Sequence, residues 1–266
     1  MLLALLLYAA AFGSTLGMPF EDPHPPPLSP LAIQLSGNPA FWSRADTGET
    51  TAIFGLLPSE ARIVLLPVSH QRALPDGYVP PDLTRSGGRL VRSLIVPDLT
   101  AMIDAAAAEG IDVAVISGYR SPAEQTMAFE SAVWQSLGRS NYTIDEAEAE
   151  ARASRFVAPP GHSQHQLGTA IDFSTDEIGY GVQAAFAETA AGRWLATNAW
   201  QYGFVLPYPQ QGEQRSGYAY EPWHYRWIGR NLAATLEGDQ YMNASDRVVD
   251  DYLKAAEELL GAAGVP

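Results

Sequence analysis

Two side chains that commonly bind metal ions, His165 and Asp172, lie in the stretch PPGHSQHQLGTAIDF at residues 159–173. The second half, TAIDF, alternates and predicts a β-strand, whereas the proline- and glycine-rich first half predicts a turn. Because side chains alternate faces along a strand, Asp172 points away from the core that Ile171 and Phe173 enter. An imidazole and a carboxylate that converge beside such a turn suit a divalent ion of the zinc type. A hydrogen-bonded structural pair is the alternative for these two residues alone.

A third ligand of the same kind is available in YEPWHYRW, residues 220–227, where His224 follows Glu221 by three positions. A catalytic zinc ion takes three protein ligands and keeps a fourth position for water, and His165, Asp172 and His224 supply three. Glu221 is then placed to accept the proton of that water. Residues three apart on an extended segment need a bend to converge, which Pro222 can supply.

Other conspicuous residues have plainer interpretations. His162 is expected to make a hydrogen bond within its loop, and His70 to lie in a surface or loop position. Arg226 is expected to form a structural ion pair, with a contact behind the ligands as the alternative. Trp223 and Tyr225 are expected in the core or in the wall of a pocket.

The composition excludes several classes of function. The chain has 16 basic and 30 acidic residues, so its net charge is −14, which argues against a surface for nucleic acid or an anionic membrane, since either would need a basic patch. It contains no cysteine, which excludes thiolate zinc sites and disulfides. An apolar content of 47% with six tryptophans is sufficient for a large core.

The chain divides into four predicted regions. Residues 1–17 form an apolar run with small residues behind it, which predicts a signal peptide or an N-terminal anchor and hence an exported protein, although no basic residue precedes the run. Residues 18–60 are a proline-rich linker and extension. Residues 61–238 are expected to form the catalytic domain, and residues 239–266 a C-terminal helical extension that packs on it or projects from it.

The expected elements of the domain alternate between helices and strands. Helices are predicted at residues 96–111, 121–138, 144–157, 186–204, from 226 to 237 and at 245–264. Ser121 is a candidate N-cap with Glu124 three positions on. Strands are predicted at residues 62–68, 112–117, 169–173, 204–208 and 217–227. This order indicates an α+β fold with helices packed on a mostly antiparallel sheet.

Three motifs in this order resemble the VanY-type D-alanyl-D-alanine carboxypeptidases, whose superfamily also holds lysostaphin-type peptidases and the hedgehog domain. They are SGYRS at residues 117–121 with Gln125 at the family's spacing, Ser-x-His-x-x-Gly-x-Ala-x-Asp at 163–172, and Glu-x-Trp-His-x-Arg at 221–226. The resemblance covers roughly residues 65–235, with no departure at a ligand or base position. It implies a hedgehog/D,D-peptidase-like fold.

The resemblance also implies an activity: one zinc ion bound by His165, Asp172 and His224 hydrolyses the terminal D-alanine from a peptidoglycan stem peptide. Glu221 would be the base, and Arg120 would stabilise the oxyanion. The residues assigned to substrate binding are Ser117, Tyr119, Gln125, Ser163 and Trp223, with Gln125 and Ser163 as holders of the terminal carboxylate. Ordinary polar contacts within a helix or turn are the alternative for Gln125, Ser163 and Tyr119. An L,D-carboxypeptidase, a peptidoglycan endopeptidase and a non-catalytic zinc-containing binding domain are the alternatives. No protein partner can be inferred.

Overall fold

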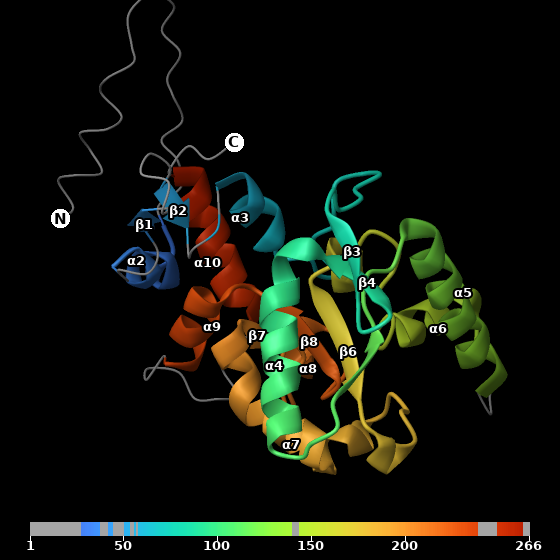
Figure 1. Ribbon diagram of the computed structural model, residues 1–266. Coiled ribbons are helices and arrows are strands. Elements are labelled where there is room, and N and C mark those ends of the chain that lie inside the picture. Colours follow the sequence, from blue (N-terminus) through green and yellow to red (C-terminus); the bar gives the residue numbers. More distant parts are fainter. Residues whose placement is uncertain are drawn as a thin grey trace, which may run out of the picture.

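The computed structural model describes residues 28–37, 42–44, 51–53, 56, 58–139, 144–238 and 249–262. A four-stranded antiparallel sheet lies at its centre, in the order β5 (Ala114–Ser117), β6 (Ala170–Ser174), β8 (His224–Trp227) and β7 (Phe204–Val205) (Figure 1). The two inner strands pair Asp172 with His224 and Ile171 with Tyr225. The predicted α+β fold with an antiparallel sheet is therefore confirmed.

The two faces of the inner strands have different chemistry. Ile171, Phe173 and Tyr225 are buried in the main hydrophobic core. The helices α4 (Val96–Ala108), α7 (Ala190–Asn198) and α9 (Arg230–Glu237) supply the other side of that core, and α4 crosses in front of the sheet in Figure 1. Because alternate side chains on a strand point oppositely, Asp172 and His224 lie together on the other face.

Two helices extend beyond the β5 edge of the sheet, α5 (Pro122–Arg139) and α6 (Glu146–Ala153), and they lie side by side (Figure 1). The predicted N-cap of α5 is confirmed. The Ser121 hydroxyl accepts the Glu124 N–H at 3.3 Å, and the Glu124 carboxylate accepts the Ser121 N–H at 2.8 Å. These reciprocal bonds are those of a capping box, which fixes where α5 begins directly after Arg120.

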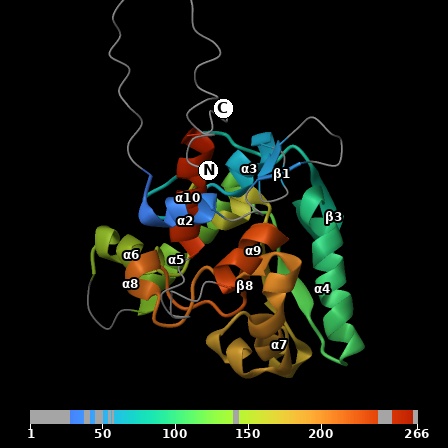
Figure 2. The ribbon, with the colours of Figure 1, turned by 90° about the vertical axis from the view of Figure 1, so that its left-hand side faces the viewer.

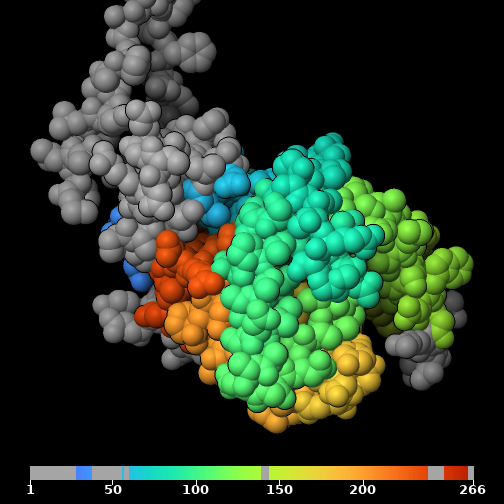
Figure 3. Space-filling model, in the orientation of Figure 1, coloured from blue at the N-terminus to red at the C-terminus, as the bar shows by residue number. Residues whose placement is uncertain are grey.

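A hairpin that the sequence analysis did not predict, β3 (Leu83–Ser86) and β4 (Arg89–Arg92), lies beside the start of α4 (Figure 3). Its two-residue turn is Gly87–Gly88 with φ of 56° and 79°, as a type I′ turn requires. Leu90 accepts the Tyr119 N–H at 2.6 Å, and a Cβ on Gly118 would lie 2.4 Å from the Leu90 carbonyl oxygen. The hairpin therefore supports the loop that carries Arg120, and it requires glycine at position 118.

The remaining elements surround the core. They are α2 (Pro30–Ser36), β1 (Trp42–Arg44), β2 (Thr51–Ile53), α3 (Pro58–Val64), α8 (Glu213–Ser216) and α10 (Val249–Ala262), with 3₁₀ turns at Ser93–Ile95, Gln164–Leu167, Asp176–Ile178, Ala184–Glu188 and Ala199–Tyr202. Figures 1 and 2 show α2 and α10 side by side, and Ser29 N–H donates to Glu258 at 2.9 Å. The buried face of α10, including Tyr252 and Leu253, joins the main core. No helix within the described ranges is long and apolar enough to cross a membrane; residues 1–17 lie outside them.

Several predicted elements were wrong or too long. Residues 62–68 do not form a strand: α3 ends at Val64, and Ala61, Val64 and Leu65 are buried at helical spacing. A short apolar run fits the periodicity of a strand and that of a helix equally well. The helix forms here because it buries its apolar face against the core. The predicted helix at 186–204 is interrupted at Thr189, whose extended backbone and hydroxyl cap α7. The strand predicted at 217–227 begins only at His224, and the strand predicted at 112–117 begins at Ala114.

Candidate metal centre and catalytic cavity

The three predicted ligands converge because one strand pair and one tight turn place them. Asp172 and His224 are opposite each other in the β6–β8 register, and His165 lies in the 3₁₀ turn before β6. That turn ends at Gly168, whose φ of +72° reverses the chain and would strain a residue with a Cβ. One ligand atom from each of the three lies within 4.8 Å of the others, and all three residues are buried.

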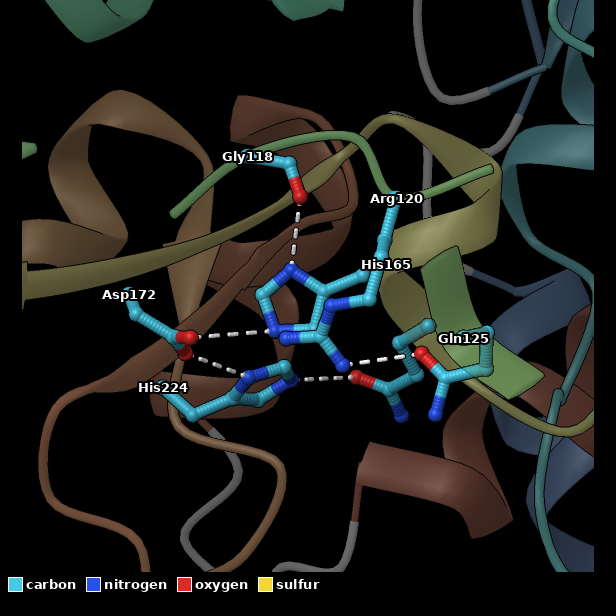
Figure 4. Close-up of polar contacts among 7 residues, drawn as sticks. Gly118, Arg120, Gln125, His165, Asp172 and His224 are labelled. Carbon is cyan, nitrogen blue, oxygen red and sulfur yellow. Dashed lines mark hydrogen bonds and ion pairs between the residues drawn. The ribbon is translucent and has the colours of Figure 1, made fainter. Parts of the chain in front are cut away.

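The hydrogen bonds of the two imidazoles leave one lone pair of each directed at Asp172 (Figure 4). Nδ1 of His165 is 2.8 Å from the Gly118 carbonyl oxygen and donates to it, and Nε2 of His224 is 3.1 Å from the Gln164 side-chain oxygen. The other nitrogens, Nε2 of His165 and Nδ1 of His224, lie 3.2 Å and 3.0 Å from the two Asp172 carboxylate oxygens. Lone pairs that converge in this way are stabilised by a cation, so the residues fit a metal ion.

The ionisation of the ligands agrees with this interpretation. Burial raises the pKa of Asp172, but protonated imidazoles at His165 and His224 would outweigh it and hold this pKa well below its usual value, so positive charge at this point keeps the carboxylate ionised. Burial lowers the pKa of His224 to about 4, so its imidazole is neutral at pH 7, the form that binds metals. Two imidazoles and one carboxylate are the ligand types of a catalytic zinc site, which leaves a coordination position open.

Glu221, the predicted base, faces the same cavity from the turn before β8. This turn is the bend expected at Pro222: the His224 N–H donates to the Glu221 carbonyl at 3.0 Å. Burial raises the pKa of the Glu221 carboxyl well above its usual value, and the charge of Asp172 adds to the shift while Arg120 opposes it. A carboxyl group with a raised pKa is suited to exchange protons near neutral pH.

Arg120 enters the cavity from the loop between β5 and α5. Its Nη1 donates to the Gln125 side-chain oxygen at 2.8 Å (Figure 4). Its backbone N–H donates to the His165 carbonyl at 3.2 Å. Gln125 is completely buried and donates in turn to the Ala158 carbonyl at 2.6 Å. Gln125 therefore orients Arg120, and both ends of its amide are occupied.

A cavity of about 200 Å³ joins these groups. Among the residues predicted to bind substrate, Ser163 and Trp223 line it. Ser117, Tyr119 and Gln125 are not among its lining residues. Ser117 pairs with Asp172 across β5 and β6, and Tyr119 is held by its main-chain bond to Leu90.

Two aromatic residues that the sequence analysis did not single out, Tyr208 and Tyr218, form another wall of the cavity. The Tyr208 ring is stacked on the His224 ring, with centroids 5.1 Å apart, and the centroid of the Tyr218 ring lies 4.5 Å from that of Tyr208. The His70 ring is stacked on the Tyr218 ring, with centroids 4.0 Å apart. The Tyr208 carbonyl accepts the Glu221 N–H at 3.2 Å. Loops far apart in the sequence therefore support the metal ligand, and no local pattern indicates such packing. Further lining residues not predicted are Phe156, Val157, Ala158, Gln164 and Val182.

The plainer interpretations have mixed outcomes. His162 makes the expected loop contact, with Nδ1 2.7 Å from the Ser69 carbonyl oxygen. Tyr225 is a core residue, as expected. Arg226 is fully buried and donates to the carbonyls of Val64 and Leu66, at 2.8 Å and 2.6 Å. These bonds satisfy the carboxyl end of α3 in place of the expected ion pair.

The fold and the site together define a zinc-dependent hydrolase. The family model described as VanY, D-alanyl-D-alanine carboxypeptidase, matches residues 88–230. The chain is 34% identical over 212 residues to a D-alanyl-D-alanine carboxypeptidase of Enterococcus faecalis (strain ATCC 700802 / V583), covering 77% of this chain and 76% of that relative. This chain therefore belongs to the VanY family of D-alanyl-D-alanine carboxypeptidases and is a zinc metallopeptidase.

Two solved structures are similar over most of the chain. A variant of the vancomycin-resistance D,D-pentapeptidase VanY from a VanB-type cassette, in complex with Zn(II), has a TM-score of 0.60 and 33% identity, covering 72% of this chain and 99% of that chain. The LD-carboxypeptidase LdcB has a TM-score of 0.61 and 30% identity, covering 80% of this chain and 93% of that chain. The shared fold therefore occurs in carboxypeptidases of both specificities.

Proposed function

We propose that this chain is a zinc-dependent D,D-carboxypeptidase that removes the terminal D-alanine from peptidoglycan stem peptides ending in D-Ala-D-Ala. The observation that carries the proposal is the convergence of His165, Asp172 and His224 on one buried point beside Glu221, within a chain of the VanY family. A zinc ion bound there acts as a Lewis acid and activates water for attack on an amide.

The chain's own residues divide the remaining work. Glu221 takes the proton of the attacking water as the C–O bond forms, and it delivers that proton to the leaving amine as the C–N bond breaks. Arg120 donates to the carbonyl oxygen while negative charge develops on it, and its guanidinium stays charged throughout. Gln125 acts through Arg120 by fixing its orientation. Ser163 and Trp223 contact the substrate from the cavity wall.

The choice between D,D and L,D specificity is tested with defined substrates. Purified enzyme is incubated with a stem pentapeptide ending in D-Ala-D-Ala and, separately, with the tetrapeptide, and the products are weighed by mass spectrometry. We expect the pentapeptide to lose one D-alanine and the tetrapeptide to remain intact. Release of D-alanine only from the tetrapeptide would establish the L,D alternative, which the similarity to LdcB supports.

A non-catalytic zinc-binding domain is the alternative of another class. The buried Glu221 and the oriented Arg120 argue against it, because a module that only binds needs neither group. If neither peptide is cleaved by zinc-loaded protein, and cleavage of internal cross-links is absent as well, this alternative replaces the peptidase. Loss of cleavage on chelation and its return with zinc would support the catalytic function.

We propose further that the enzyme acts outside the cytoplasm, on the cell wall. The support is the apolar run at residues 2–12 followed by small residues, and a substrate class found in the wall. Fractionation of cells that express the full chain, with sequencing of the mature N-terminus, tests this proposal and distinguishes a cleaved signal from a retained anchor.

A further inference from the structure

The catalytic cavity is small compared with the substrate proposed above. Its volume of about 200 Å³ is less than the roughly 300–1,000 Å³ typical of small-molecule sites. An extended pentapeptide spans up to roughly 17 Å at about 3.4 Å per residue. The cavity can therefore enclose only the carboxyl end of a stem peptide, and the amino-terminal part must lie against another surface.

A second hollow, which we call the α5–α6 groove, adjoins the catalytic cavity. It has a volume of about 430 Å³, lies between α5 and α6, and shares Phe156 and Val157 with the catalytic cavity. By contrast, the cavity between α7 and the segment at Tyr220 and Pro222 shares no lining residue with the catalytic cavity. A peptide that leaves the catalytic cavity past Phe156 therefore enters the α5–α6 groove.

The chemistry of the groove suits a peptide with small side chains. Ala128 and Ala132 on α5 and Ala153 on α6 line it with methyl groups, while Gln135, Ser136 and Arg152 add polar groups. None of the described lining residues is a carboxylate. Alanyl methyl groups fit such a surface, and the amide groups of a peptide can bond to the polar side chains.

A large aromatic side chain is exposed where the two hollows meet. Phe156 lines both of them and is 60% exposed. The polar and ligand-type residues of the catalytic cavity, in contrast, are buried. An exposed aromatic ring at such a junction is available to pack against a bound peptide.

We propose that the α5–α6 groove binds the amino-terminal residues of the stem peptide, so that α5 and α6 select long substrates over short ones. This inference rests on the proposed function, since it extends the same substrate beyond the bond that is cut. The main support for this proposal is that the catalytic cavity and the α5–α6 groove are continuous at Phe156 and Val157. The alanine side chains of the groove would contribute to the affinity for the peptide.

The test narrows the groove without altering the catalytic cavity. Ala132→Leu and, independently, Ala128→Leu place a larger side chain into the groove, and leucine is a good helix former. Ala151→Leu is the matched control, because Ala151 is an exposed alanine of α6 that does not line the groove. For each protein, kcat/KM is measured with the stem pentapeptide and with N-acetyl-D-Ala-D-Ala, and zinc content confirms the folded site.

We expect the ratio of the two kcat/KM values, pentapeptide over short substrate, to fall about tenfold in both groove variants, at the lower end of the effect of one methylene in a hydrophobic pocket. The ratio should be unchanged in Ala151→Leu. An unchanged ratio in both zinc-loaded groove variants would overturn the proposal. If, in addition to that unchanged ratio, gel filtration showed that the unaltered protein is a dimer and that the substitutions dissociate it, the groove would instead be a dimer interface. Absence of cleavage of both substrates by the unaltered enzyme would instead contradict the proposed function.

Discussion

The catalytic cavity and the α5–α6 groove beside it are built differently. The strand wall of the cavity stands on β6 and β8, whereas the helix wall consists of the groove on α5 and α6 together with residues 156–158, which follow α6. On the strand side, His165 and His224 are each held by a second hydrogen bond, and all three ligands, Asp172 included, are no more than 7% exposed. On the helix side, Phe156 is 60% exposed, and alanine methyl groups and polar side chains line the neighbouring groove. The strand wall therefore holds the metal-ligand side chains in one fixed geometry, whereas the helix wall presents an exposed surface that a substrate can contact.

This contrast follows from the elements themselves. Antiparallel pairing fixes Asp172 opposite His224 in a register that cannot slip without turning Ile171 out of the core. Helices α5 and α6 pack mainly on each other and leave much of α5 exposed to solvent. We therefore expect substitutions in the strand wall to alter the rate of reaction, and substitutions in the helix wall to alter substrate preference or stability.

The largest effect is expected at Glu221. Glu221→Gln keeps the size of the side chain but removes its capacity to accept a proton, so kcat should fall about 10³-fold, within the range for general acid–base catalysis. Zinc should remain bound, because Glu221 is not among the three ligands. Steady-state kinetics with zinc analysis of the same preparation checks both parts. Activity within tenfold of the unaltered enzyme would remove Glu221 from the mechanism.

The next effect is expected at Arg120. Arg120→Met removes the cation that faces the developing oxyanion, and kcat should fall by about 10²–10³-fold, as for other oxyanion donors. Gln125→Leu retains the guanidinium but removes its orienting contact at 2.8 Å, so the fall should be smaller. Kinetics of both variants under saturating substrate separate kcat from KM. If Gln125→Leu lowered kcat as much as Arg120→Met does, Gln125 would have a role beyond orienting Arg120.

The ligands and the base could be predicted from sequence because each depends on local geometry. The alternation of side chains along a strand predicts which face of the sheet Asp172 occupies. The three-residue spacing between Glu221 and His224, with Pro222 between them, predicts the bend that brings both side chains into one site. The fold class followed from the order of elements. The same local reasoning failed for residues 62–68, where the run RIVLLPV suits a strand or a buried helix and the contacts of Ala61 and Val64 decide. It also overlooked the Gly87–Gly88 turn, although two adjacent glycines are a hairpin signal.

The rest of the cavity depends on contacts between distant segments. Tyr208 lies in the cavity because its ring stacks on His224, and Tyr218 because its ring packs between those of Tyr208 and His70. No spacing in the sequence relates these residues. Gln125 was predicted as a substrate contact from its motif, yet its burial and its bond to Ala158 are properties of the packed structure.

A smaller effect, on metal affinity, is expected at Tyr208 on the strand side. Tyr208→Leu removes the ring that supports His224, and zinc affinity should fall about tenfold, the lower end of the effect of contacts behind a metal ligand. Tyr208→Phe keeps the stacked ring and should bind zinc as the unaltered enzyme does. Competition with a chelator of known affinity measures both. If the phenylalanine variant loses as much affinity as the leucine variant, the hydroxyl rather than the ring supports the site.

The smallest effect is expected on the helix side, at the start of α6. The Asp145 carboxylate accepts the Glu148 N–H at 2.8 Å and caps the helix. Asp145→Ala should lower the free energy of unfolding by about 1 kcal/mol, the usual value of an N-cap, whereas Asp145→Ser keeps a capping oxygen and should lose less. Urea denaturation measures the change. Because Asp145 touches none of the catalytic groups, kcat on a short substrate should be unaltered, and a tenfold fall would show that the two walls are coupled.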